Sequence, residues 1–497
     1  MMADTSVAGG EDEAAPDDAG FRADLALLRT IVIVAGLGWS VLFVVIGLRY
    51  ELQFYADGSL FSYSIAVQDG WAFHWHDIPD RLFVYLFSYV PAQTYIALTS
   101  DARGGTVVYG LLFFSAQLAG LAATFAADGS KRRILFCTAC ASTASLCPLV
   151  FGFPTEMWMA HALFWPALAL CHYARAGIAA IAWVFAALLA LVLTHEGAVI
   201  LAVAILSTVL LRGVRDAAFV RAAGGFVAAM AIWGLVKAAF PPDAYVGAAM
   251  ARIARHFFDA DILTSHLMLL LAGTLAAYAL VLLALRRPSP AHAHLLAAAI
   301  VAVGLAAYWL WFDRALHADG RYYMRTVLLI ATLAFGMPAA LRALAADGRL
   351  ALPLPLLPRP TGALAHGATV RAGIGALALV TLVHAVETAK FVAAWTRYEA
   401  AVRALAMGAA SDPALGDARF VSSQRIGADL NRLAWFSTTH FLSVLLAPGL
   451  APARLVIDPQ ANYFALSCAT ARANEEAERA VPVASRRLVR VYACLHR

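Results

Sequence analysis

Residues 177–211 read GIAAIAWVFAALLALVLTHEGAVILAVAILSTVLL, and His195 and Glu196 are the only charged or titratable residues in this apolar run. A helix needs roughly 18–20 apolar residues to cross a membrane. The run therefore predicts two membrane-spanning helices, over 177–194 and 197–211, joined by a tight turn at His195 and Glu196 that Gly197 eases. Because carboxylates and imidazoles are costly beside hydrocarbon, this turn is also a candidate functional position.

The whole chain has the composition of a membrane protein. Of its 497 residues, 62% are hydrophobic and only 14% are charged, and the mean hydropathy is +0.73. A soluble core cannot use that much apolar surface. The apolar runs are rich in Leu and Ala without strict alternation, which favours helices over a β-barrel. The net charge of +5 comes from basic residues scattered at the ends of these runs, so no nucleic acid partner is expected.

These runs predict an all-α polytopic membrane protein with about eleven transmembrane helices. A further stretch, 82–98, is interrupted by Pro91 and Gln93. If it spanned the membrane, the basic cluster at 131–133 would lie outside. If it lies in the interface, that cluster and the other basic clusters lie inside, as the positive-inside rule prefers, so we expect an interfacial helix in the first outer loop. The spans are expected near 28–48, 106–126, 134–152, 157–174, 177–194, 197–211, 219–240, 263–285, 294–312, 326–345 and 372–393.

The same rule places the N-terminus in the cytoplasm and the C-terminus outside, in what we expect to be a bacterial inner membrane. Three regions follow: a disordered acidic cytoplasmic tail over 1–24, a transmembrane domain over 25–393, and a small extracytoplasmic domain over 394–497. The last region has mixed charges and strand-like or amphipathic runs such as 453–457. Its two cysteines, Cys468 and Cys494, would form a disulfide in an oxidising compartment.

The other four cysteines lie in apolar runs, where a small thiol is usually a packing residue. Cys137 and Cys140 have a C-x-x-C spacing, but no second pair of ligands lies nearby in the sequence. We therefore expect packing there, rather than a metal or redox role.

Four titratable residues are expected on the outer side, each beside a long apolar run: Asp57, Glu156, His195 and Glu196. Each of these residues taken alone is an ordinary polar residue in a loop between two apolar runs. Together they are candidate catalytic residues, because a carboxylate there could accept a proton from an acceptor hydroxyl. Gly58 and Ser59 after Asp57 predict a tight turn and a helix cap, which would hold the Asp57 carboxylate close to the membrane surface.

The first outer loop, about 49–105, is rich in aromatic residues and charges. This density suits helices at the membrane–water boundary, and the alternative is a lid over a lipid-facing active site. Within the loop, His74-Trp75-His76-Asp77 has a weak metal-ligand spacing. We include His76 among the candidate substrate-binding residues and assign no metal or cofactor.

A later outer loop carries Arg314, Arg321 and Arg325, against the positive-inside trend. These arginines could pair with Asp313 and Asp319, or they could hold a lipid phosphate or pyrophosphate, which the guanidinium fork fits. In the last span, His384, Glu387 and Lys390 lie at helical spacing. They predict an internal ion-pair network near the outer end, and a proton relay is the alternative.

The layout resembles the GT-C superfamily of integral-membrane glycosyltransferases over residues 25–393. Four features match. One span precedes a long outer loop with an early acid, Asp57, and a short second outer loop carries Glu156. A turn carries His195 and Glu196, and a later outer loop is rich in arginine. The commonest pattern of this superfamily pairs two acids in the first loop, whereas Asp57 stands alone here. The resemblance implies inverting sugar transfer from a polyprenyl-phosphate donor on the outer face. Asp57 would be the general base, Glu156 a second acid, and Arg314, Arg321 or Arg325 would hold the lipid phosphate.

Two other classes of protein remain open on the sequence. A polytopic transporter or lipid flippase would carry polar residues deep in several spans and internal repeats. A polymerase or ligase of lipid-linked polysaccharide would have similar basic outer loops. The acceptor on the outer face could be a lipid, a glycan or a protein.

Overall fold

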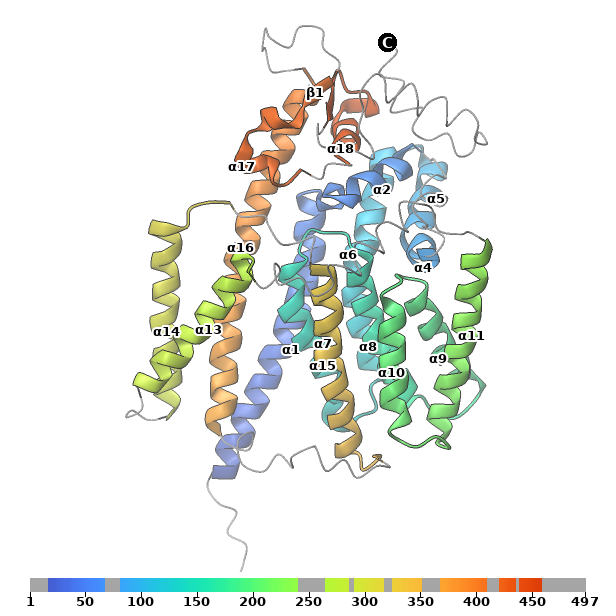
Figure 1. Ribbon diagram of the computed structural model, residues 1–497, viewed down its shortest axis with the longest axis vertical. Helices are drawn as coiled ribbons and strands as arrows, with labels where there is room; N and C mark the ends of the chain where they lie inside the picture. The colour runs from blue at the N-terminus through green and yellow to red at the C-terminus, as the bar shows by residue number, and fades with distance from the viewer. Residues whose placement is uncertain are drawn as a thin grey trace, which may run out of the picture.

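The computed structural model describes residues 17–67, 81–239, 264–285, 290–316, 324–350, 367–408, 420–434 and 438–457. In these ranges the chain is mostly α-helical, with two short strands (Figure 1). The helices are α1 Asp17–Arg49, α2 Asp57–Ala66, α4 Leu82–Val84, α5 Val90–Thr99, α6 Ala102–Ala127, α7 Ile134–Leu146, α8 Glu156–Tyr173, α9 Ile178–Val192, α10 Ala198–Leu210, α11 Ala217–Ala239, α13 His266–Ala284, α14 Pro290–Ala307, α15 Met324–Ala346, α16 Gly367–Ala406, α17 Ala428–Asn431 and α18 Thr439–Leu446. The strands are β1 Phe420–Ser422 and β2 Leu455–Ile457.

Every one of the expected spans falls on a helix, but the expected count of eleven is not confirmed. Among the described residues, eight helices are long and apolar enough to cross a membrane. Seven of these coincide with expected spans, and the eighth is Leu82–Thr99, where α4 and α5 are joined through a π-helical segment, Tyr85–Tyr89. The helices α9 and α10 are apolar but shorter. The stretch expected to lie in the interface thus has the length and composition of a membrane-spanning helix.

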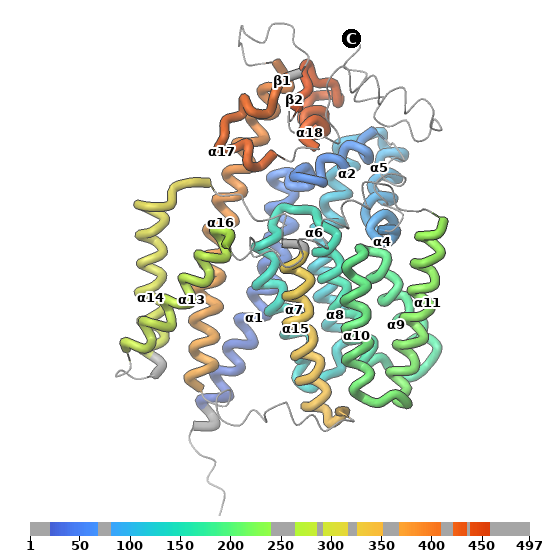
Figure 2. The backbone as a smooth tube through the Cα atoms, in the orientation of Figure 1, coloured from blue at the N-terminus to red at the C-terminus, as the bar shows by residue number. Residues whose placement is uncertain are grey.

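The centre of the bundle is held by close helix contacts at small residues. A Cβ atom added to Gly36 of α1 would lie 2.6 Å from the Cys140 backbone of α7. One added to Gly120 of α6 would lie 2.3 Å from the Ala162 carbonyl oxygen of α8. Small residues let membrane helices approach in this way. As a result α8 is almost wholly buried, while α13 and α14 lie on one flank and α9 and α11 on the other (Figure 2).

Basic side chains gather at one end of the bundle, which we call the basic end. Lys131 Nζ donates to the Ala346 carbonyl at 2.8 Å, and Tyr173 Oη donates to Asp347 Oδ2 at 2.6 Å. The start of α1 lies at the same end (Figure 1). There Asp24 accepts a hydrogen bond from Arg371 Nε at 2.7 Å, so residues 17–24, expected in a disordered tail, are helical. Acidic residues at the start of a helix are favourable with its dipole.

The other end of the bundle carries the C-terminal segment. The helix α16 passes the expected boundary at 393 without a break and ends at Ala406, before Gly408 with φ +68. Residues 394–406 contain no Pro or Gly, and a left-handed glycine is a common helix stop. Beyond it, β1 and β2 pair in parallel, which confirms a strand within 453–457. Cys468 and Cys494 lie outside the described residues, whereas Cys137, Cys140, Cys147 and Cys171 are free.

Candidate active site

Three chain segments that carry the expected acids meet at the end of the bundle opposite the basic end. A Cβ atom on Gly58, next to Asp57, would lie 2.6 Å from Pro154, two residues before Glu156. A Cβ atom on Gly197, next to Glu196, would lie 3.2 Å from the Met157 sulfur. The structure thus brings the turn before α2, the start of α8 and the α9–α10 turn together.

Arg81 lies at the centre of this meeting point. Its Nη1 contacts Glu156 Oε1 at 2.7 Å, and its Nη2 lies 3.9 Å from Glu196 Oε2. Burial alone lowers the pKa of Arg81, but the carboxylates of Glu156, Glu196 and Asp57 together raise it above its usual value. The Arg81 guanidinium is therefore a permanent cation among three acids. We call Asp57, Arg81, Glu156, His195 and Glu196 the Arg81 site.

One donor of Arg81 is not used. Its Nε is buried and has no hydrogen-bond partner among the described residues. Leaving a buried N–H without an acceptor costs roughly 1–3 kcal/mol, and more for a charged group. An unused guanidinium donor is a feature that an anionic ligand oxygen would satisfy.

His195 adds an imidazole to the site. The Gly197 N–H donates to His195 Nδ1 at 3.0 Å. The same nitrogen lies 3.5 Å from Glu196 Oε2, so the ring is held against this carboxylate.

Asp57 is the first residue of α2 and is partly buried. The residue before it, Ala56, has φ 52 and ψ −128, a conformation that is unfavourable for any residue but glycine. Strain of this kind persists only where the surroundings impose it, and it is common at functional sites. The Ala56 carbonyl accepts hydrogen bonds from Thr438 Oγ1 at 3.1 Å and from Ser59 Oγ at 2.9 Å.

Of the candidate phosphate-binding arginines, only Arg314 has its side chain among the described residues. Arg314 is exposed, and its Nε donates at 2.8 Å to the carbonyl of Leu310, in the helical segment that precedes it. Arg321, His76 and the side chain of Arg325 lie outside the described residues. Of the expected site residues, the structure therefore unites Asp57, Glu156, His195 and Glu196, and it adds Arg81, which the sequence analysis did not single out.

A second polar cluster links α13, the segment after α14, and α16. Lys390 Nζ lies 2.8 Å from Asp313 Oδ2 and 3.2 Å from Glu387 Oε1, while His266 Nε2 lies 3.2 Å from Asp313 Oδ2. Of the expected network of His384, Glu387 and Lys390, the ion pair between Glu387 and Lys390 is confirmed. His266, Asp313 and Glu387 also have the spacing of a metal site, with ligand atoms within 4.8 Å of one another. Because the Lys390 ammonium already contacts both carboxylates, we interpret the cluster as an ion-pair network.

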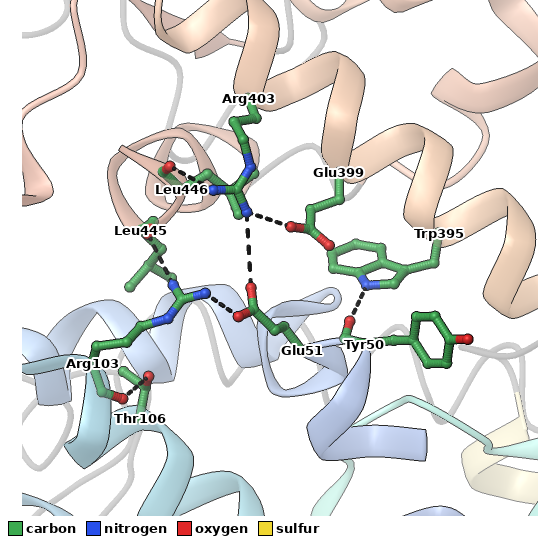
Figure 3. Close-up of polar contacts among 9 residues, drawn as sticks. All are labelled: Tyr50, Glu51, Arg103, Thr106, Trp395, Glu399, Arg403, Leu445 and Leu446. Carbon is green, nitrogen blue, oxygen red and sulfur yellow. Dashed lines mark hydrogen bonds and ion pairs between the residues drawn. The ribbon is translucent and has the colours of Figure 1, made fainter. Parts of the chain in front are cut away.

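A third set of charges ties the C-terminal segment to the bundle (Figure 3). Glu51 pairs with Arg103 and lies 3.9 Å from Arg403, which also contacts Glu399 at 2.6 Å. Arg103 Nη1 and Arg403 Nη1 donate to the carbonyls of Leu445 and Leu446, each at 3.3 Å. We call Glu51, Arg103, Glu399 and Arg403 the arginine clamp. Both arginines line a largely apolar cleft of about 360 Å³ beside the end of α18.

The sequence offered weak signals for these additional residues. Arg81 immediately precedes the apolar run 82–98, and Arg103 precedes the run of α6. Arginines on an expected outer side run against the positive-inside trend, which is a reason to look for acidic partners. Only the fold shows which acids those partners are.

Comparisons with other proteins do not place the chain in a family. No protein-family description, curated protein or solved structure matches it. The fold and site define a mostly helical protein with apolar helices of membrane-spanning length and a partly buried cluster of acids around one arginine.

Proposed function

We propose that this protein is an integral-membrane glycosyltransferase of the GT-C kind, which transfers a sugar from a polyprenyl-phosphate donor to an acceptor on the outer face of the membrane. The observation that carries this proposal is the Arg81 site, where residues from three distant segments surround one partly buried guanidinium. A polar site of this kind at the end of a membrane bundle suits a ligand that is half lipid and half charged.

In this proposal Asp57 is the general base and Arg81 the phosphate ligand. Asp57 is partly exposed at the start of α2, so its carboxylate can accept the proton of an incoming hydroxyl. The unused Nε–H of Arg81 would donate to an oxygen of the lipid phosphate and stabilise the charge that develops as the sugar leaves. Glu156 fixes the guanidinium through its 2.7 Å contact. Arg81 thus takes the role that the layout assigned to Arg314, Arg321 or Arg325.

The test measures free polyprenyl phosphate, a product that forms whichever acceptor receives the sugar. The purified protein in lipid nanodiscs receives a panel of polyprenyl-phosphate sugars and a bacterial envelope extract, and mass spectrometry quantifies free polyprenyl phosphate. Asp57→Asn keeps the shape of the side chain but removes the base, so release should fall by roughly 10²–10⁴-fold. Asp429→Asn is the matched control, because Asp429 is an exposed residue of α17 with a surface ion pair.

Two outcomes would count against the proposal. Near-normal release by Asp57→Asn, with an active parent protein, excludes Asp57 as the base. No release from any donor of the panel by the parent protein rejects the glycosyltransferase assignment.

A lipid transporter or flippase is the second candidate, and the network of His266, Asp313, Glu387 and Lys390 is the observation in its favour. Ionisable groups among membrane helices are common in ion and proton pathways. In that case Asp313→Asn should stop donor translocation in proteoliposomes, and Asp57→Asn should leave translocation unchanged.

A further inference from the structure

The helix α18 of the C-terminal segment lies against the turn that carries Asp57. Thr438, immediately before α18, donates from Oγ1 to the Ala56 carbonyl at 3.1 Å. The Ser59 hydroxyl lies 2.9 Å from the Ala56 carbonyl and 3.2 Å from the Thr438 carbonyl, and it can donate to either. All of these groups are buried. Residues far apart in the sequence thus form one small hydrogen-bonded unit beside Asp57.

The unit holds a backbone that does not favour its own conformation. Ala56 has φ 52, where a side chain is strained, and its carbonyl is the acceptor that Thr438 and Ser59 share. Such a residue keeps its conformation only while neighbouring contacts fix it. Because Asp57 follows Ala56 directly, a rotation of this peptide would move the Asp57 carboxylate.

The rest of α18 is fixed as well. Phe441 packs on Tyr63 of α2 with ring centroids 4.9 Å apart, and Ser443 Oγ accepts from the Val456 N–H of β2 at 3.1 Å. At the far end, the arginine clamp binds the last carbonyls of α18 (Figure 3). Cations at a helix C-terminus satisfy free carbonyls and complement the helix dipole. The helix is therefore anchored at both ends, and Thr438 sits at the end that touches the Asp57 turn.

We propose that α18 is the support of the Arg81 site, and that Thr438 is a positioning residue for Asp57. The C-terminal segment then has a defined role in the reaction, because it sets the geometry of the base. This inference rests on the proposed function for its catalytic part only. The structural part of the inference is that Thr438 holds the Ala56–Asp57 turn. This part is independent of the reaction and can be tested without it.

Three variants separate positioning from general stability. Thr438→Val removes the hydroxyl at nearly constant shape, and Thr438→Ser restores it. Thr332→Val is the matched control, because Thr332 is another buried threonine, and its hydroxyl donates to the Leu328 carbonyl of its own helix, α15. Hydrogen–deuterium exchange of the full-length protein in nanodiscs reports on the Gly58 and Ser59 amides, which donate to the Tyr55 and Ala56 carbonyls.

Loss of one hydrogen bond should raise exchange at 57–60 by about tenfold in Thr438→Val, with parent-like exchange there in Thr438→Ser and Thr332→Val. In the polyprenyl-phosphate assay, kcat of Thr438→Val should fall by about tenfold while KM for the donor changes by less than about twofold, and Thr438→Ser should restore kcat. Unchanged exchange in Thr438→Val overturns the inference. Raised exchange with unchanged kcat overturns the catalytic part. If the parent protein releases no polyprenyl phosphate, the proposed function fails, and the exchange result alone decides whether Thr438 holds the turn.

Discussion

His440 shows how one buried residue of α18 makes the protein sensitive to acid. Burial lowers its pKa to about 3, from an ordinary value of 6.5. The folded state therefore keeps His440 neutral, whereas the unfolded state takes up a proton as the pH falls below 6.5. The free energy of unfolding consequently decreases below pH 6.5 and continues to decrease until about pH 3. At pH 5 it should be about 2 kcal/mol lower than at pH 7.5.

Thermal unfolding of the full-length protein in detergent at pH 7.5 and pH 5 tests this expectation. His440→Gln keeps a polar side chain that does not titrate, so its loss of Tm between the two pH values should be smaller than that of the parent protein. Equal losses in both proteins would show that His440 contributes nothing to the acid sensitivity.

At the scale of elements, the contact of α6 with α8 depends on the lack of a side chain at Gly120. A Cβ atom there would lie 2.3 Å from the Ala162 carbonyl oxygen, which is backbone and cannot move alone. Gly120→Val should therefore push α6 away from α8 and destabilise the protein by about 1–3 kcal/mol. Gly234→Val on α11 is the control, because nothing lies within 4 Å of its added Cβ atom.

The measurement is the midpoint of thermal unfolding of the two variants in the same detergent. A fall in Tm for Gly120→Val that does not exceed the fall for Gly234→Val would mean that α6 and α8 do not pack through Gly120. The start of α8 carries Glu156, so this packing also sets the position of one acid of the Arg81 site.

At the scale of the whole molecule, charge is divided between the two ends of the bundle. Lys131 contacts Ala346 and Arg371 contacts Asp24 at the basic end, whereas the Arg81 site lies at the other end. Basic clusters are retained in the cytoplasm, so the basic end should be cytoplasmic. Topology reporters fused after Arg133 and after Asp347 should both read as cytoplasmic.

A reporter fused after Ser100, at the opposite end of α6, should read as extracytoplasmic. The same is expected of a fusion at Arg497, in the C-terminal segment. An extracytoplasmic signal from the Arg133 fusion, or the same side for Arg133 and Ser100, would contradict this topology and with it the placement of the Arg81 site on the outer face.

The acids of the candidate site were predictable because their signal is local. Asp57, Glu156, His195 and Glu196 each stand beside an apolar run, and a polar residue in such a place is visible in the sequence. Their common end of the bundle followed from counting spans. The partner of these acids was not predictable, since Arg81 is one of several arginines near helix ends and only packing brings it to Glu156.

The sequence by itself determined the helical class, the presence of a helix at each expected span and the grouping of basic residues at one end, because hydropathy and charge act over a single helix. Tertiary structure alone decided that Thr438 reaches Ala56 and that Glu51 bridges Arg103 and Arg403. These contacts join segments that lie far apart along the chain. Their formation depends on the close packing of helices and on the strain that packing imposes at Ala56, and neither is encoded in the periodicity of a single run.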